Sequence, residues 1–360
     1  MSDTVMITTG GTGGHIFPGL AVASRLVAKG CKVFWLGTRD GIEARLVPQH
    51  GVDFEAIRFG GVRGKGLKRL FLGPFSLLLA FWQSLRVIRR RAPDVVLGLG
   101  GFASFPGALM GVAWGRPLAI HDANAVAGLA NRILAFGADR ILLGFPDALR
   151  GKHAAKVQWV GNPLRDDIVA VARPEQRFAG RKGPLKLLVL GGSLGAVALN
   201  ERVPSALALL APSQRPQVTH QAGDAHLEAL RRAYAEAGAA AECVAFIADM
   251  ASRYAEADLV VCRGGALTVA ELAAVGVGSV IVPLPGAIAD EQTHNARFLV
   301  DAGAASLVPQ PELTPQFLAD MLAGYDRERL LAMAILARSV ARTDATERVA
   351  DACMELARSR

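Results

Sequence analysis

The stretch VMITTGGTGGHIFPGLAVASRL at residues 5–26 joins a short β-type run, a glycine-rich turn and a long helical pattern. A second stretch of the same kind, LKLLVLGGSLGAVALNERV at 185–203, begins about 180 residues further along. Each is typical of the first strand, turn and helix of a parallel sheet that is buried on both faces. The repeat therefore predicts an α/β protein with two doubly wound domains.

Further apolar runs extend outward from these two starting points. We expect strands at CKVFWLG (31–37), DVVLGLG (94–100), RPLAIH (116–121), RILLGF (140–145), QVTHQAG (217–223), ADLVVC (257–262) and GSVIVPL (278–284). A polar segment rich in Pro, Gly and Arg follows Asn162, and we place the domain boundary there. The predicted domains are 1–163 and 164–340, and 341–360 is expected to be a helix with no further strand.

The composition limits what else the chain can contain. Its 360 residues are 51% hydrophobic, enough for two domains with cores. The longest apolar stretch, Leu70 to Trp82, is interrupted by Gly73-Pro74 and falls short of the roughly 20 residues that a spanning helix needs. The first residues lack the pattern of a signal peptide. The four cysteines have neither metal nor disulfide spacing, so we expect reduced thiols.

Positive charge is concentrated near the start of the chain. Residues 1–91 carry 14 basic and 5 acidic side chains, and residues 62–91 carry eight basic side chains and no acidic one. A helix after Pro74 could expose Phe75, Leu79 and Trp82 to an anionic membrane surface while the basic residues meet the headgroups. The alternative is a buried core helix with solvated ends. No nucleic-acid-binding motif surrounds the basic run, so nucleic acid is not an expected partner.

The first glycine-rich turn runs from Gly10 to His15. Glycines let a backbone approach a phosphate or sugar closely, and the amides at a helix start attract anions. The alternative is a tight turn that binds nothing. The dinucleotide-binding fingerprint fits poorly here, because Ile16 stands where the third glycine should be.

Another glycine pattern, from Gly98 to Ala103, matches the relaxed form of that fingerprint. No acidic residue follows at a strand end about 20 residues on, where Asp122 comes closest. No Walker A motif occurs in the chain, so simple hydrolysis of a nucleoside triphosphate is not expected.

The second half carries a fuller set of candidate residues. Gly191-Gly192-Ser193 ends its first strand, and Arg263-Gly264-Gly265 leads into a helix whose first-turn amides would face a diphosphate. Glu271 on that helix could accept both ribose hydroxyls, or could be an ordinary acid near a helix start. The polar run from Asp290 to Asn295 could bind sugar hydroxyls, although such runs are common at helix starts.

Together the motifs resemble the MurG family, the UDP-N-acetylglucosamine–lipid I N-acetylglucosaminyltransferases of peptidoglycan synthesis. The matching strings are GGTGGHIFPGLAVA, GLGGFASFPG, ANAVAGLANRILA, GNPLR, LGGSLGA, HQAG, FIADM, CRGGALTVAEL and DEQTHNA, spread over residues 5–305. The resemblance implies the GT-B fold, with two Rossmann-like domains facing across a cleft and the last helix packing on the first domain. It implies UDP-GlcNAc and lipid I as substrates, no cofactor, and a peripheral location on the cytoplasmic face of the bacterial inner membrane. Proteins of cell-wall synthesis and cell division become possible partners.

The resemblance also assigns roles to individual residues. Ile247 would hold the uracil edge through its backbone, with Met250 packed nearby, and Glu271 would take the ribose. The acceptor would face His15 and Asn124. The residues implied on the donor side are Thr12, Gly13, Gly14, Arg165, Ser193, Ile247, Met250, Ala266, Leu267, Thr268, Glu271, Glu291, Gln292 and Asn295.

Four positions depart from the family pattern. Asp122-Ala123 stands where the family has Glu-Gln, and Phe102 replaces a tyrosine. Leu194 replaces a glutamine, and Glu291 stands where a histidine or glutamine is usual. The departures put hydrogen bonds to the acceptor and to the donor sugar in doubt.

The resemblance implies an inverting transfer, in which a general base takes a proton from the attacking hydroxyl. The chain has no Asp-x-Asp, so helix amides, Ser193 and Arg165 are expected to stabilise the leaving UDP without a metal. His15 at a helix start is expected to be neutral and able to act as the base. Alternatively, His15 anchors its loop or binds the acceptor, and Asp122 is a rival base that would be weaker if solvated.

Two other classes of function stay open at this point. One is another GT-B enzyme, such as a diacylglycerol sugar transferase or a UDP-GlcNAc epimerase. The other is a nonenzymatic protein that binds a nucleotide sugar.

Overall fold

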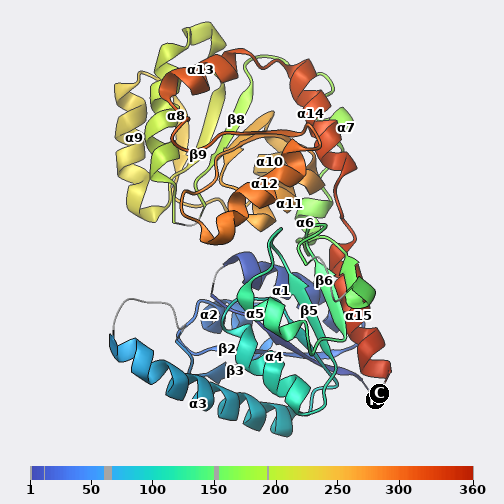
Figure 1. The fold of residues 1–360 in the computed structure, drawn as a ribbon. Helices are drawn as coiled ribbons and strands as arrows, with labels where there is room; N and C mark the ends of the chain where they lie inside the picture. The colour runs from blue at the N-terminus through green and yellow to red at the C-terminus, as the bar shows by residue number, and fades with distance from the viewer. Residues whose placement is uncertain (1, 12, 61–66, 150–153, 193, 360) are drawn as a thin grey trace. The chain divides into compact units, whose positions relative to one another are not determined.

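The computed structural model describes residues 2–11, 13–60, 67–149, 154–192 and 194–359 (Figure 1). The chain forms two compact units. One comprises Met1–Arg165 with Arg342–Arg360, and the other comprises Asp166–Ala341. Each unit contains one parallel sheet.

The sheet of the first unit has seven parallel strands in the order β3-β2-β1-β4-β5-β6-β7. The order reverses between β1 and β4, which is where ligands bind in doubly wound sheets. The strands are β1 (Thr4–Thr8), β2 (Lys32–Thr38), β3 (Asp53–Ile57), β4 (Val95–Gly98), β5 (Leu118–Asp122), β6 (Arg140–Leu143) and β7 (Val157–Trp159).

Helices cover both faces of this sheet, because alternate residues of its strands point to opposite sides. Val5 and Ile7 of β1 pack with α1 and α15, while Met6 packs in the core that α3 and α4 cover. The helices of this unit are α1 (Gly13–Ala28), α2 (Glu43–Gln49), α3 (Leu67–Arg91), α4 (Ser104–Ala113), α5 (Leu129–Leu134) and α15 (Ala345–Arg358), with a short 3₁₀ turn at Ala154–Lys156.

The sheet of the second unit has six parallel strands in the order β10-β9-β8-β11-β12-β13. Its strands are β8 (Lys186–Leu190), β9 (Gln217–Gln221), β10 (Ala241–Val244), β11 (Leu259–Cys262), β12 (Gly278–Ile281) and β13 (Ala305–Leu307). Its helices are α6 (Asp166–Val169), α7 (Pro174–Phe178), α8 (Val197–Leu209), α9 (Leu227–Glu236), α10 (Met250–Glu256), α11 (Ala266–Val275), α12 (Glu291–Val300), α13 (Pro315–Ala323) and α14 (Arg327–Ser339), with 3₁₀ turns at Pro212–Gln214, Asp224–His226 and Ile288–Asp290.

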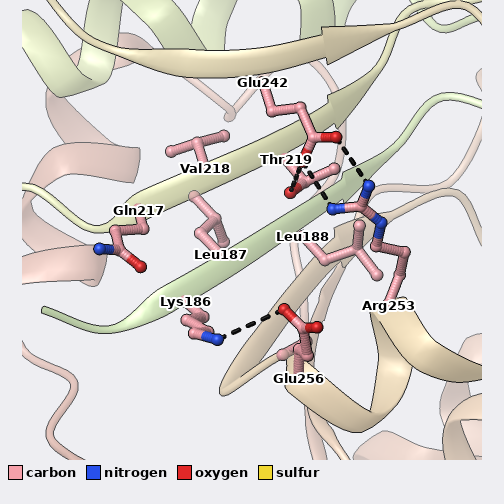
Figure 2. Close-up of a pocket in the computed structure, with 10 residues that line it drawn as sticks. Lys186, Leu187, Leu188, Gln217, Val218, Thr219, Glu242, Arg253 and Glu256 are labelled. Carbon is pink, nitrogen blue, oxygen red and sulfur yellow. Dashed lines mark hydrogen bonds and ion pairs between the residues drawn. The ribbon is translucent and has the colours of Figure 1, made fainter. Parts of the chain in front are cut away.

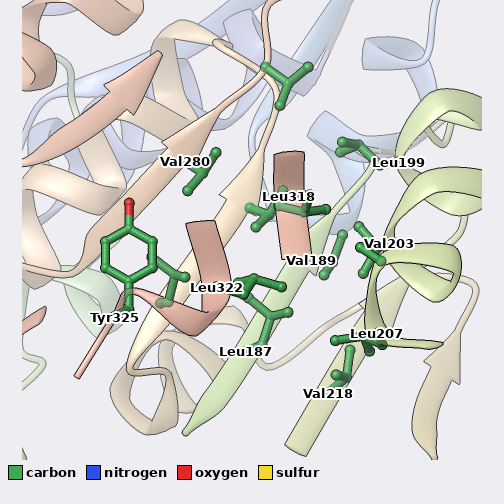
Figure 3. Packing of buried hydrophobic residues seen from close by; sticks show 14 of the residues in the cluster. Leu187, Val189, Leu199, Val203, Leu207, Val218, Val280, Leu318, Leu322 and Tyr325 are labelled. Atoms are coloured by element: carbon green, nitrogen blue, oxygen red, sulfur yellow. The ribbon is translucent and has the colours of Figure 1, made fainter. Parts of the chain in front are cut away.

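One core of the second unit lies between β8 and the helices α8 and α13 (Figure 3). Leu187 and Val189 of β8 meet Val203 of α8 and Leu318 of α13 there. Like the other central strands, β8 is apolar because helices cover both faces of the sheet. This continuous apolar run is the pattern from which the central strands were predicted.

The sequence analysis missed four strands, β3, β7, β10 and β13. They are the outermost strands of the two sheets. Each has only one neighbouring strand and stays partly exposed, so none carries the continuous apolar run of a central strand.

The helix α3 also differs from expectation. It was expected to start after Pro74, but it begins at Leu67 and contains this proline in its interior. None of the helices within the described ranges is long and apolar enough to cross a bilayer.

Candidate functional site

Two glycine-rich turns of the first unit pack backbone against backbone. They follow β1 and β4, at the carboxyl ends of neighbouring strands. Thr9 Oγ1 donates a 2.9 Å hydrogen bond to the Gly100 carbonyl oxygen. A side chain at Gly101, where φ is +76°, would place its Cβ 2.5 Å from the Gly10 carbonyl oxygen. Glycine is therefore required at residue 101 both by conformation and by close approach.

His15 lies in the first turn of α1, beside the second of these turns. A Cβ added at Gly100 would lie 3.5 Å from His15 Cδ2, so the imidazole lies against this backbone. Burial lowers the pKa of His15 below its usual value of 6.5. The imidazole is therefore neutral at pH 7 and able to accept a proton. The cause is desolvation, whereas the sequence argument relied on the positive end of the helix.

Asp122, the alternative to His15 as the base, is a buried carboxylate and not a solvated one. Its side chain belongs to a residue that is only 3% exposed. The carboxylate accepts hydrogen bonds from Asn124 N at 3.2 Å, Gly128 N at 3.1 Å and Asn131 Nδ2 at 3.0 Å. It fixes the turn after β5, in which Asn124 is partly exposed. Asp122 therefore shapes this turn and is a poor candidate for the base.

The neighbouring His121 is also a structural residue. It is buried, and its Nε2 lies 2.9 Å from the Gly161 carbonyl oxygen, to which it donates. Burial lowers the pKa of His121 to about 4. The imidazole is therefore neutral and helps to join β5 to the segment after β7.

In the second unit, the helix α11 begins with amides that its own N-cap residue does not cap, because that residue is a glycine. Its N-cap residue is Gly265, and the helix starts at Ala266 as predicted. The amides of Ala266, Leu267 and Thr268 lie in this first turn, where the helix dipole favours an anion. The side chain of Arg263 is not available to an anion here, because its Nη1 donates to the carbonyls of Val282 and Pro283.

Glu271 is held in place by a residue that the sequence analysis missed. Tyr254 on α10 is fully buried, and its hydroxyl donates to Glu271 Oε2 at 3.0 Å. Glu271 is a partly exposed residue. A carboxylate that is held in place on a partly exposed residue suits the two hydroxyls of a ribose.

The segment between β10 and α10 carries the predicted base-binding residues. The side chain of Ile247 is buried, and Met250 is the partly exposed first residue of α10. Because the Ile247 side chain packs inward, the residue can offer only its backbone to a ligand.

The residues predicted to read the sugar lie at the start of α12. Gln292 Oε1 accepts a 2.9 Å hydrogen bond from Leu284 N, and Glu291 is the partly exposed first residue of the helix. Asn295 is only 1% exposed, and its Nδ2 donates to the Gly264 carbonyl at 3.1 Å. In this structure Asn295 supports the turn before α11 and offers no surface to a sugar.

Thr12, Gly13, Gly14, Arg165 and Ser193 complete the set of predicted residues. Thr12 and Ser193 lie outside the described residues. Gly13 and Gly14 begin α1, and Arg165 is the partly exposed last residue of the first segment of its unit. At the position of a usual glutamine, Leu194 is 87% exposed.

A pocket in the second unit is distinct from this site (Figure 2). It is lined by residues of β8, β9, β10 and α10, including Lys186 and Gln217, the first residues of β8 and β9. The pocket therefore lies at the amino ends of these strands, whereas the glycine turns follow the carboxyl ends of the strands. The charged side chains of the pocket pair with one another, Arg253 with Glu242 and Lys186 with Glu256. These pairings leave little charge to attract a ligand.

The helix α3 exposes an apolar stripe. Phe75 is 72% and Trp82 58% exposed, with Leu78 and Leu79 also exposed between them. The guanidinium of Arg86 lies 5.8 Å from the centre of the Trp82 ring. At the far end of the helix, Arg90 and Arg91 form ion pairs with acids of β3. The stripe is therefore flanked by cations, some of which are already paired.

Comparison with known proteins places both units in one family. Residues 5–143 match the N-terminal domain of glycosyltransferase family 28, and residues 186–349 match its C-terminal domain. A protein of Aromatoleum aromaticum named UDP-N-acetylglucosamine–N-acetylmuramyl-(pentapeptide) pyrophosphoryl-undecaprenol N-acetylglucosamine transferase is 58% identical over 357 residues, covering 99% of each chain. A protein of the same name from Dechloromonas aromatica is 55% identical over 358 residues, covering 99% of this chain and all of its own.

Solved structures agree with this assignment. The crystal structure of Acinetobacter baumannii MurG matches with a TM-score of 0.85 at 39% identity, covering 98% of this chain and 99% of its own. A UDP-N-acetylglucosamine 2-epimerase matches with a TM-score of 0.67 at 14% identity over 100% of this chain and 98% of its own, which shows a shared fold alone. The chain has the GT-B glycosyltransferase fold, and it belongs to glycosyltransferase family 28 and, within it, to the MurG family.

Proposed function

We propose that this chain transfers GlcNAc from UDP-GlcNAc to the 4-hydroxyl of the MurNAc residue of lipid I, giving lipid II. The observation that carries the proposal is the 58% identity, over 99% of both chains, to a protein named for this transfer. The reaction inverts the configuration at the anomeric carbon and uses no metal. We assign acceptor and membrane binding to the first unit and donor binding to the second.

The donor half of the proposal uses residues of α10, α11 and α12 together with Ile247, Ser193 and Arg165. The backbone of Ile247 takes the uracil edge, and Glu271 takes the ribose hydroxyls with Tyr254 holding its carboxylate. The amides of Ala266 to Thr268 bind the diphosphate, together with Ser193 and the positive charge of Arg165. Because these groups are fixed before the reaction, they stabilise the charge that grows on the leaving UDP. Gln292 and Glu291 face the sugar.

The acceptor half of the proposal uses His15 and Asn124. The neutral imidazole of His15 takes the proton from the acceptor hydroxyl, whose oxygen attacks the anomeric carbon as the bond to UDP breaks. The lowered pKa of His15 keeps it in the form that accepts a proton. Asn124, on the turn that Asp122 shapes, orients the acceptor.

The first test of the function is release of UDP from UDP-GlcNAc. We expect release that depends on lipid I and stays within about twofold when EDTA is added, because amides and cations of the protein do the work of a metal. The measurement is a coupled UDP assay with the purified protein. Diacylglycerol in place of lipid I, and UDP-GlcNAc without acceptor, are the controls. Transfer to diacylglycerol alone, epimerisation of UDP-GlcNAc, or loss of activity with EDTA would contradict the proposal.

We further propose that α3 brings the enzyme to the cytoplasmic face of the inner membrane. The exposed apolar stripe enters the headgroup region while basic residues of the helix meet anionic lipids. Burying apolar surface contributes about 25 cal/mol of free energy per Å². The exposed stripe of α3 can therefore anchor the protein in the headgroup region.

Replacing Phe75, Leu79 and Trp82 together with serine should lower binding to vesicles that contain phosphatidylglycerol by about tenfold or more. Turnover of a short-chain, water-soluble acceptor should stay within about twofold, since the stripe lies outside the proposed chemistry. The measurement is co-sedimentation with vesicles. Serine in place of the exposed Phe317 and Leu336 of the second unit is the matched control. Undiminished binding by the triple variant would rule out this anchor.

A further inference from the structure

A buried carboxylate lies under the glycine turn that leads to His15. Glu43 is the first residue of α2, and no part of it is exposed to solvent. Among the residues that the structure describes, no Lys or Arg forms an ion pair with it. Burial of a carboxylate is costly unless hydrogen bonds satisfy its oxygens. The sequence analysis assigned this residue no role.

Hydrogen bonds from two segments satisfy Glu43. Its Oε1 accepts from Thr38 N at 3.0 Å and from Thr38 Oγ1 at 2.5 Å. Its Oε2 lies 3.4 Å from Gly11 N, which donates to it. Thr38 is the last residue of β2, and Gly11 belongs to the turn after β1. The carboxylate therefore ties the glycine turn to the neighbouring strand.

The space for this carboxylate comes from glycines in three separate places. A Cβ at Gly10 or at Gly41 would overlap Glu43 Oε1, and a Cβ at Gly37 would lie 2.8 Å from Glu43 Cγ. Any side chain at these positions would displace the carboxylate. Gly10 is thus needed for the packing of Glu43 as well as for any ligand.

The other side of the turn is fixed by separate contacts. Trp35 Nε1 donates to the Thr9 carbonyl at 3.0 Å, and Thr9 Oγ1 donates to the Gly100 carbonyl at 2.9 Å. His15 lies against Gly100. A turn that loses its support at Glu43 can shift toward α2, and this shift would carry the start of α1 and the imidazole with it.

We propose that Glu43 is a positioning residue, which holds the Gly10–Gly11 turn so that the His15 imidazole is placed to take the acceptor proton. The proposal rests on the function proposed above for His15. Glu43 itself cannot touch a substrate, because it has no exposed surface. Proton transfer and attack need placement to within about half an ångström, so small shifts of a supporting group lower turnover.

Glu43→Gln tests the proposal, because glutamine has the same shape but replaces one acceptor oxygen with an NH₂ group. That NH₂ group would face either the Thr38 donors or Gly11 N, so that one donor would lie opposite another and a hydrogen bond would be lost. We expect kcat to fall about tenfold or more, with KM for UDP-GlcNAc within about twofold, since all the proposed donor residues except Arg165 belong to the second unit. Rates are referred to the folded fraction of each variant, because a partly unfolded preparation would also lower the apparent kcat without changing KM.

A double-mutant cycle with His15→Ala gives the sharper result. If Glu43 acts through His15, then Glu43→Gln should lower kcat in the wild-type background and leave it within about twofold in the His15→Ala background. Asp94→Asn is the matched control. Asp94 Oδ2 accepts from Thr4 N at 2.8 Å, at the amino ends of the strands of the same sheet, whereas Glu43 supports the turn at their carboxyl ends. Asparagine at this position removes the charge and keeps an oxygen that can accept from Thr4 N, so this variant should keep normal turnover.

If Glu43→Gln does not fold, Thr38→Val provides the same test by removing only the hydroxyl donor. It should lower kcat about threefold or more in the wild-type background alone, whereas Thr38→Ser keeps the donor and should keep the activity. Normal turnover of the foldable variant, or an equal loss in both backgrounds, would overturn the role of Glu43 while leaving that of His15 intact. Normal turnover of His15→Ala would instead overturn the proposed base, and the role of Glu43 with it.

Discussion

His15→Ala is expected to lower kcat by about 10²- to 10⁴-fold, the range that a general base contributes. All the proposed donor residues except Arg165 belong to the other unit, so KM for UDP-GlcNAc and binding of UDP should stay within about twofold. The measurement is steady-state UDP release with lipid I, together with calorimetric titration of UDP. His50→Ala is the matched control, since His50 is an exposed histidine of the same unit whose Nδ1 donates to the Leu46 carbonyl.

The pH dependence separates a base from a binding residue. The pKa of His15 is lowered by burial, so the imidazole is neutral above that pKa and protonated below it. In the wild type, kcat/KM should rise with pH through this pKa, so the midpoint of the acid limb should lie below pH 6.5, the usual value. His15→Ala should lose this acid limb together with its turnover.

Two results would contradict the assignment. Near-normal turnover of His15→Ala would exclude His15 as the base. A raised KM for lipid I with unchanged kcat would show that His15 binds the acceptor without taking its proton.

The central strands of both sheets could be predicted from the sequence because burial on both faces leaves a readable pattern. β1 shows this pattern in the consecutive residues Val5, Met6 and Ile7, which are all buried. The edge strands could not be predicted in the same way. β10, for example, places Glu242 in the sheet because that side of the strand is exposed and pairs with Arg253.

The parts of the candidate site that consist of one short motif could be predicted from the sequence. Residues that hold such a motif in place from another segment of the chain could not. The start of α11 after Gly265 follows from a strand, two glycines and a helical run. Glu43 gave no signal, because its neighbours Gly10 and Thr38 lie in other segments. The burial of Asp122 could not be predicted for a related reason, since a residue at a strand end can be either solvated or enclosed by the turn that follows.

Glu271 is the residue for which we expect the largest effect on the donor. Glu271→Gln should raise KM for UDP-GlcNAc and Kd for UDP about 10- to 100-fold, because hydrogen bonds to a charged group are worth roughly 1.5–3 kcal/mol. With saturating donor, kcat should change far less, since the ribose is remote from the bond that breaks. The measurements are steady-state kinetics and calorimetric titration of UDP.

The decisive comparison uses a donor that lacks one hydroxyl. The wild type should bind 2′-deoxy-UDP about tenfold or more weakly than UDP, whereas Glu271→Gln should bind the two almost equally. Tyr254→Phe removes only the hydroxyl that holds the carboxylate, so it should weaken binding by less, about three- to fivefold. Glu256→Gln is the matched control, because Glu256 pairs with Lys186 at the amino end of β8, whereas the candidate site follows the carboxyl ends of the strands. An acid that merely stabilised its own helix would lower the melting temperature but would leave the preference for UDP over 2′-deoxy-UDP unchanged, and that outcome would remove Glu271 from the ribose site.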